Sequence, residues 1–411
     1  MMHKVFRVCA GIDVHKQVLY VCLLKVGSDG RVSREVRTFG TTTRELLALL
    51  DWLVAEYCES VAMESTGVYW KPVFNILESS IKVVLVNAQH VKALPGRKTD
   101  VQDCEWIAEL HLHGLVRPSF IPPREIRELR DLVRTRTKLI AERAQHVNRI
   151  QKVLEDANLK LGSVAADVLG VSGRAMLERI VAGETDPQAL ADQARGRMRS
   201  KRPQLREALE GRVRPHHRLL LRTHLQLIDH LDAAAATLTQ EIEERMRPFA
   251  EIRDRLDAIP GIGPDAATVY LSEMGADASP WPSYQHAASW AGLCPGHHES
   301  AGKRKSGRTR HGNRWIKQVF VQAAWCAQRT NGSYMQAHFR RLRVRRGPKK
   351  AAVAVAHSLF VRCFMLVASG STYHELGAAF FDERRKEAVT QKLVRRLKDL
   401  GYEVSLTANA A

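Results

Sequence analysis

Short apolar runs separated by turn residues dominate the first ninety residues of this chain. The runs that predict β-strands lie at residues 5–12, 17–25, 31–39, 61–64 and 81–86. A glycine-rich turn at Gly27–Gly30 makes the first three a meander, and leucines spaced for a helix follow a threonine cap at 41–57. Because strands then alternate with helices, this part predicts an α/β layer.

From Arg124 onward the apolar spacing changes to three, four and seven residues, which predicts long helices. We expect one helix to about Asn158, a glycine-containing tip at 161–199, and a return helix at about 203–246. Together they would form a coiled-coil-like arm that serves for spacing and oligomerisation. A mainly α-helical domain begins near Ile252, and a charged tail follows Asp382. The predicted domains are residues 1–120, 121–250, 251–380 and 381–411.

The last helical domain opens on a glycine-rich stretch, Ala258–Ala267, with the form of a helix-hairpin-helix. Such a turn presents backbone N–H groups to phosphate, although a plain helix connection would use the same residues. Later in the domain, an apolar run over 351–368 is interrupted by His357 and Arg362. That run predicts a buried helix and not a membrane span.

Charge indicates the partner. The 411 residues include 63 Lys and Arg against 44 Asp and Glu, a formal charge of +19, and the stretch 303–350 holds fifteen basic residues and no acid. This concentration favours a nucleic-acid partner. The seven cysteines contain no CxxC pair, which argues against a zinc ribbon or a disulfide framework and favours a reducing cytoplasm.

Four acids suggest a chemistry. Asp13 and Glu64 end predicted strands, and Asp100 and Asp103 lie three residues apart in the first turn of a predicted helix, where Glu105 would face away. Each acid alone could be a turn residue or a helix cap. Four carboxylates at one place would instead suit two Mg²⁺ or Mn²⁺ ions and phosphodiester chemistry.

The motifs around these acids resemble a known family. Gly11–Lys16, Met63–Trp70 and Lys98–Cys104 are similar to motifs of the DEDD transposases of the one-hundred-and-ten insertion-sequence family. Two later motifs, Ile259–Gly263 and Trp290–Leu293, are similar to the C-terminal transposase domain of that family. The resemblance implies a RuvC-like, ribonuclease-H-type N-terminal domain and a transposase or site-specific recombinase of an insertion sequence.

By this resemblance Asp13, Glu64, Asp100 and Asp103 carry over as metal ligands, and a serine carries over as the nucleophile. Ser300 is the first candidate, but Ala301 stands where the family commonly has glycine, so Ser306 with Gly307 remains a rival. Both serines could instead only contact phosphate.

The family also implies donor and target DNA as partners and an element-encoded noncoding guide RNA. Because recombination joins two duplexes, we expect a homo-oligomer, either a dimer or a tetramer. The residues predicted to contact nucleic acid are Lys98, Gly261, Gly263, Lys303, Arg304, Lys305, Arg308, Arg310 and Arg314.

Other functions fit the same residues. A metal-dependent Holliday-junction resolvase or nuclease would use water in place of serine. A non-catalytic nucleic-acid-binding protein would use the acids as caps and the basic segment to hold phosphates. A zinc-binding regulator would rest on Cys294, His297 and His298.

Overall fold

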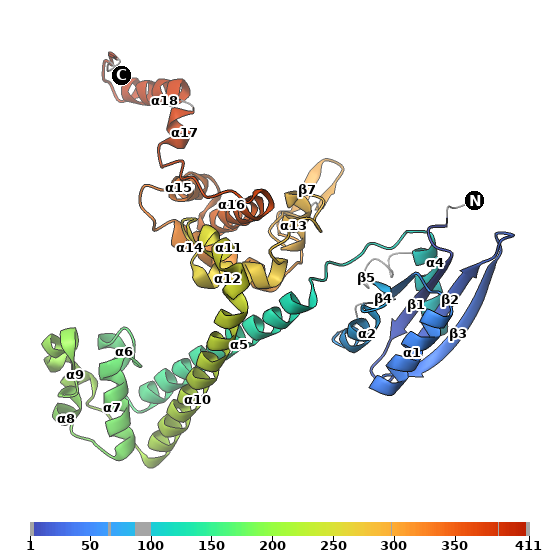
Figure 1. The fold of residues 1–411 in the computed structure, drawn as a ribbon. Helices are drawn as coiled ribbons and strands as arrows, with labels where there is room; N and C mark the ends of the chain where they lie inside the picture. Colours follow the sequence, from blue (N-terminus) through green and yellow to red (C-terminus); the bar gives the residue numbers. More distant parts are fainter. Residues whose placement is uncertain (1–3, 65–66, 87–99, 297, 385, 408–411) are drawn as a thin grey trace. The chain divides into compact units, whose positions relative to one another are not determined.

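The computed structural model describes residues 4–64, 67–86, 100–296, 298–384 and 386–407 (Figure 1). By its internal contacts the chain divides into two compact units, residues 1–121 and 122–411. The first unit is a mixed sheet with helices, and in the described residues of the second unit the regular structure is helical except for one small hairpin. These features fit the predicted α/β and mainly α-helical parts. The finer domain boundaries remain a prediction.

The sheet of the first unit has five strands in the order β3-β2-β1-β4-β5. They are β1 (Val8–Val14), β2 (Val18–Val26), β3 (Val32–Gly40), β4 (Ser60–Glu64) and β5 (Lys82–Val86). The first three pair antiparallel, as the predicted meander requires, and β4 and β5 run parallel to β1. The five strands predicted from the apolar runs are therefore confirmed.

Helices cover both faces of this sheet. The helices are α1 (Thr43–Ala55), α2 (Trp70–Leu77) and α4 (Asp100–Leu112). Ala10, Ile12 and Val14 of β1 pack in one core with α1 and α2. Cys9 instead packs with Cys104 and Ala108 of α4 on the other face. β1 is thus buried on both faces, which explains its continuous apolar sequence.

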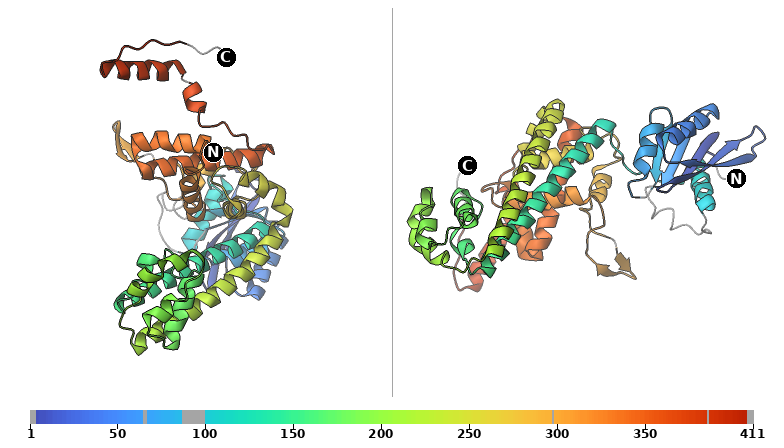
Figure 2. Two further views of the ribbon diagram at one scale, coloured as in Figure 1. Left: turned by 90° about the vertical axis from the view of Figure 1, so that its left-hand side faces the viewer. Right: turned by 90° about the horizontal axis from the view of Figure 1, so that it is seen from below.

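Two long helices, α5 (Arg124–Asp156) and α10 (Pro215–Met246), lie side by side in the second unit (Figures 1 and 2). The predicted return helix, from about residue 203, begins too early. A short helix, α9 (Arg202–Ala208), ends first, and the long helix α10 starts only at Pro215. At the break, the backbone N–H of Arg212 donates to the carbonyl of Ala157. Proline suits a helix start because its missing N–H would be unpaired there.

The two long helices do not share a continuous apolar seam. Along their described middle, no residue of α5 between Val133 and Ile150 is fully buried. Polar pairs join the helices there instead, such as Arg143 with Asp232 at 2.5 Å. Leu219 and Leu220, which belong to the apolar pattern of the predicted return helix, are 62% and 42% exposed in the single chain. Buried residues gather only at the two ends of the described pair, so the coiled coil and its role in oligomerisation stay predictions.

At one end of the pair lies the tip, a small helical bundle with its own core. Its helices are α6 (Leu161–Val164), α7 (Val171–Ala182), α8 (Pro187–Ala191), η1 (Gly196–Lys201) and α9. Leu161, Met176 and Leu205 are fully buried there against Leu154 of α5 and Leu221 of α10. The tip therefore closes the end of the arm.

The other end of the pair enters a larger helical core. Its helices are η2 (Arg247–Phe249), α11 (Ala250–Asp257), α12 (Pro264–Met274), α13 (Tyr284–Trp290), α14 (Arg314–Ala327), α15 (Tyr334–Arg346) and α16 (Pro348–Ser369). α16 is long and apolar enough to cross a membrane, but Val355, Leu359 and Phe360 are fully buried in this core. The prediction of a buried helix is confirmed.

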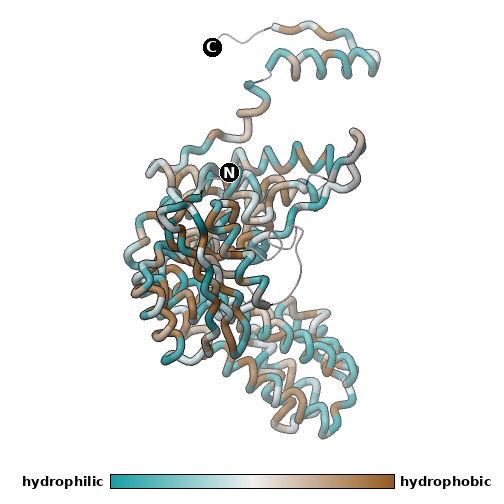
Figure 3. The backbone as a smooth tube through the Cα atoms, turned by 90° about the vertical axis from the view of Figure 1, so that its right-hand side faces the viewer, coloured by the Kyte–Doolittle hydropathy of each residue, from teal (hydrophilic) through white to brown (hydrophobic). Residues whose placement is uncertain are grey.

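Two further helices, α17 (Phe380–Glu383) and α18 (Lys386–Asp399), follow the core. No described residue of α18 is buried, and polar and apolar residues alternate along it (Figure 3).

Candidate active site

Alternation along the strands places Asp13 and Glu64 on the same face of the sheet. β1 and β4 run parallel with Ile12 opposite Met63, so Asp13 and Glu64 follow at adjacent strand ends. Ile12 and Met63 point into the core with α1 and α2. Since side chains alternate along a strand, the two acids point to the opposite face, which α4 covers.

α4 approaches this face closely at Gly11. A Cβ at Gly11 would lie 2.3 Å from the backbone N of Ala108 and 2.4 Å from the carbonyl O of Cys104. Only glycine fits so near to another backbone, which is a recognised reason for a glycine inside a strand. The contact sets the height of the first turns of α4, and therefore of Asp103, above β1.

Electrostatics also link three of the acids. Burial raises the pKa of Asp13; the nearby His15 opposes this shift, and the negative charges of Asp103 and Glu64 add to it. Asp13 is only 7% exposed. A buried carboxylate such as Asp13, with two further carboxylates near enough to disfavour its charged form, is costly without a counter-ion. Divalent cations would remove that cost, so these residues fit a Mg²⁺ or Mn²⁺ site.

Glu105 takes no part in this group. Its carboxylate pairs with Arg34 at 2.8 Å, and the same Arg34 also pairs with Glu109. The sequence prediction that Glu105 faces away from Asp103 is confirmed. Asp100 begins α4, but its side chain lies outside the described atoms, so its role as the fourth ligand stays a prediction.

The two candidate serines lie on opposite strands of one hairpin, β6 (His298–Ser300) and β7 (Lys303–Ser306). Ala301 and Gly302 form its turn with φ of +49° and +73°. A two-residue turn with positive φ at both positions is typical of tight hairpins. The alanine between Ser300 and Gly302 is therefore a turn residue, and it holds a conformation that glycine adopts more easily.

Of the two candidate serines, Ser306 alone has a described side chain. Ser306 is half-buried, and its hydroxyl oxygen accepts from the backbone N–H of Arg308 at 3.2 Å. The side chains of Ser300 and His298 are outside the described atoms. The choice between the two serines stays a prediction.

Known proteins resemble both units. Residues 10–159 match the model of the DEDD transposases of IS110, described as transposase, and residues 253–340 match the model described as "Transposase IS116/IS110/IS902 family". A curated relative, "Putative transposase y4pF/y4sB" of Sinorhizobium fredii, is 27% identical over 325 residues, which cover 77% of this chain and 74% of the relative. The chain belongs to the IS110 transposase family.

Two solved structures were also found, "T. thermophilus RuvC in complex with Holliday junction substrate" and "Thermus thermophilus RuvC structure". Each covers 27% of this transposase and 99% of its own chain, with a TM-score of 0.22 and sequence identities of 15% and 16%.

Most residues predicted to contact nucleic acid lie in the hairpin region of the transposase. Lys303, Arg308, Arg310 and Arg314 are exposed, while the side chains of Arg304 and Lys305 are outside the described atoms. Lys98 also lies outside the described residues.

The two glycines of the predicted helix-hairpin-helix differ. Gly261, with φ of +95°, packs against Ala323 and Ala327 of α14, so tight packing explains the glycine there. Gly263 caps α12 in open space. Two helices do flank this turn, as predicted, but phosphate binding to it stays a prediction.

Sequence reasoning missed two residues of the transposase site. His15 places Nε2 3.0 Å from Oδ2 of Asp13, and its ring meets Tyr20 edge-on. Its position two residues after Asp13, immediately beyond the end of β1, was the available signal. The second is Gly11, whose signal was a glycine within an otherwise apolar strand.

A separate group, Asp156, His216 and His217, has the spacing of a metal site. Its hydrogen bonds argue against one. Nδ1 of His217 accepts from the backbone N–H of Arg214 at 3.1 Å, so Nε2 carries the proton and donates to Asp156 at 2.8 Å. A metal would need that nitrogen unprotonated. The group therefore joins the end of α5 to the start of α10.

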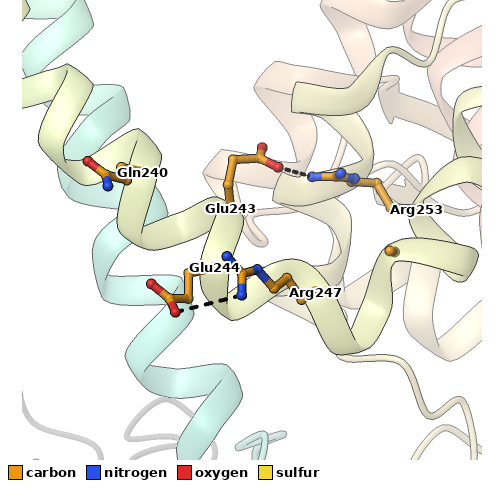
Figure 4. Close-up of a pocket in the computed structure, with 6 residues that line it drawn as sticks. Gln240, Glu243, Glu244, Arg247 and Arg253 are labelled. Atoms are coloured by element: carbon orange, nitrogen blue, oxygen red, sulfur yellow. Dashed lines mark hydrogen bonds and ion pairs between the residues drawn. The ribbon is translucent and has the colours of Figure 1, made fainter.

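A pocket at the end of α10 offers no chemistry for the transposase (Figure 4). Its lining residues are Gln240, Glu243, Glu244, Arg247, Ala250 and Arg253. The charges pair with one another, since Glu243 contacts Arg253 at 2.6 Å and Glu244 contacts Arg247 at 3.9 Å.

Proposed function

We propose that this transposase cleaves and rejoins DNA with divalent metals held by Asp13, Glu64, Asp100 and Asp103 and with Ser300 as the nucleophile. The observation that carries the proposal is that Asp13 and Glu64 follow paired residues of β1 and β4 on the face that α4 covers, and that the charges of Glu64 and of Asp103 on α4 both raise the pKa of Asp13. Mg²⁺ or Mn²⁺ bound there would activate the attacking oxygen and stabilise the leaving oxygen.

The residues of the chain have distinct tasks in this reaction. The serine hydroxyl gives up its proton and attacks a DNA phosphorus, so that an Oγ–P bond forms. The bond from phosphorus to a sugar oxygen breaks, and that oxygen takes up a proton. A sugar hydroxyl of the strand to be joined then reverses the step and frees the serine. His15 holds the Asp13 carboxylate in position from the exposed side.

The partners follow from this activity. Transposition joins two duplexes, so we propose a homo-oligomer acting on donor and target DNA in the cytoplasm. A guide RNA would leave sequence reading to base pairing, and the exposed Lys303, Arg308, Arg310 and Arg314 support backbone contacts of that kind. All seven cysteines are free thiols, which suits a reducing compartment.

One matched pair of variants tests the metal site. Asp103→Asn removes a proposed ligand, whereas Glu105→Gln removes an acid of the same helix that pairs with Arg34. We expect Asp103→Asn to abolish excision of a plasmid-borne element and Glu105→Gln to leave it within about threefold, because a surface pair contributes only about 0.2–1 kcal/mol. Equal activity of the two variants would refute the metal site.

A second pair tests the nucleophile. A denaturing gel should reveal a covalent protein–DNA adduct with the wild type and with Ser306→Ala, but not with Ser300→Ala. The opposite result would make Ser306 the nucleophile. Cleavage without any adduct would favour the water-using junction resolvase. Recombination indifferent to Mg²⁺ and to all four acid substitutions would favour a non-catalytic binding protein.

A further inference from the structure

A buried carboxylate, Glu273 near the end of α12, connects three segments of the second unit. It is 1% exposed. Nε and Nη2 of Arg134 on α5 donate to its two oxygens at 2.6 and 2.8 Å, and Nδ2 of Asn313 donates to Oε2 at 2.6 Å. Arg130 lies 3.3 Å from the same oxygen. Both carboxylate oxygens are thus satisfied by charged or amide donors.

The two arginines also hold α5 against its neighbours by other contacts. Arg130 donates to the backbone carbonyls of Ser272 and Glu273 at 3.2 and 2.6 Å. Burial lowers the pKa of Arg130 to about 10, and the charge of Glu273 opposes that shift. Arg134 lies over the ring of Trp315 at 5.7 Å, in the first turn of α14. A guanidinium so placed binds α5 to both α12 and α14.

Asn313 carries the connection to the start of α14. Its Oδ1 caps α14 by accepting from the N–H groups of Trp315 and Ile316 at 2.9 and 3.1 Å. Its own backbone N–H donates to the carbonyl of Trp290. One side chain therefore caps a helix with its oxygen and holds Glu273 with its nitrogen.

The root of the serine hairpin lies beside this connection. The backbone N–H of Gly296 donates to the carbonyl oxygen of Arg308, and the backbone N–H of Arg310 donates to the carbonyl oxygen of Cys294. Gly312 then packs so tightly against Gly292 that a Cβ on it would lie 2.3 Å from the backbone N of Gly292. Both strands of the hairpin therefore leave from a backbone cluster fixed by Asn313 and its neighbours.

We propose that Glu273 is a positioning residue that, through Asn313, fixes the root of the hairpin, residues 294–296 and 308–310, relative to α5. The catalytic part of this inference rests on the proposed serine nucleophile, but the structural part does not. Glu273 is buried and is not one of the proposed metal ligands. It acts on the reaction only by limiting the movement of the hairpin.

Three full-length variants separate the roles of Glu273 and Asn313. Glu273→Gln removes the carboxylate. Asn313→Ser keeps a good helix cap but is too short to reach Glu273. The double variant Glu273→Gln with Asn313→Asp returns one carboxylate to the cluster at the other position and reverses the hydrogen bond. Glu243→Gln, which breaks a surface pair with Arg253, is the matched control.

Trypsin measures the hairpin directly, because Lys303, Arg304, Lys305 and Arg308 are cleavage sites within it. We expect Asn313→Ser and Glu273→Gln to raise the rate of cleavage there about tenfold, since each loses a charge-assisted hydrogen bond that opposes local opening. The double variant should recover most of the protection, and Glu243→Gln should match the wild type. Thermal melting of each variant confirms that it is folded.

The same proteins are then tested for formation of the serine–DNA adduct. In Asn313→Ser the rate of adduct formation should fall about a hundredfold if the serine is displaced by roughly 1 Å. The positioning role would be overturned if Asn313→Ser and Glu273→Gln are folded but match the wild type both in trypsin resistance and in adduct yield. If the wild type forms no adduct but the trypsin rates change as expected, Glu273 still positions the hairpin, and the proposed nucleophile is wrong.

Discussion

Replacing Gly11 by alanine tests whether the approach of α4 to β1 sets the geometry of the acids. The added Cβ would lie 2.3 Å from the backbone N of Ala108, while ordinary contact begins at 3.4 Å. Backbone cannot turn aside as a long side chain can, so α4 must move away from β1 by about 1 Å. Asp103 lies on the same helix and would move with it.

The expected effects on stability and on activity differ in size. Overpacking of this kind costs about 1–3 kcal/mol, which a folded domain usually survives. A displacement of about 1 Å at a catalytic group can cost about a hundredfold in rate. Gly11→Ala should therefore remain folded but lose nearly all strand cleavage.

Cleavage of a supercoiled plasmid carrying the element ends measures the rate, and urea unfolding measures the stability. Gly40→Ala is the control in the same sheet, because its Cβ would meet only the flexible side chain of Glu45, at 3.2 Å. It should cleave like the wild type. Wild-type cleavage by folded Gly11→Ala would refute the argument that this contact positions Asp103.

Three further predictions concern other parts of the molecule. Burial lowers the pKa of His111 to about 4 from 6.5, so the unfolded chain binds a proton more readily than the folded chain. The free energy of unfolding should therefore fall by about 2 kcal/mol from pH 7 to pH 5. Urea unfolding at the two pH values should show a smaller loss in His111→Gln. Ala301→Gly should keep the hairpin resistant to trypsin, whereas Ala301→Val should make it more susceptible, because φ of +49° is unfavourable for a β-branched residue. His217→Ala should lower the free energy of unfolding by about 2 kcal/mol, because it loses the hydrogen bonds to Asp156 and Arg214. Zn²⁺ and chelators should leave the melting temperature of the wild type unchanged. A rise of the melting temperature with Zn²⁺ would show a metal site instead.

Periodicity predicted local structure well in the first unit and less well in the arm. Strands with both faces buried have continuous apolar sequences, and β1 and β4 were visible for that reason. In α10, Leu219 and Leu220 have the spacing of a packing face but are exposed in the single chain. Helical spacing shows which residues share a face, but not whether a neighbour covers that face.

The sequence by itself determined the candidate acids, the order of the strands along the chain and the family resemblance, because each depends on residue type and local spacing. Only the tertiary structure decided that the charges of Glu64 and Asp103 raise the pKa of Asp13 and that Glu105 pairs with Arg34. It likewise decided that Glu273 joins α5 to the start of α14. These contacts join residues between 40 and 139 positions apart, and their distances are set by how helices pack on a sheet and on one another, which no local pattern records.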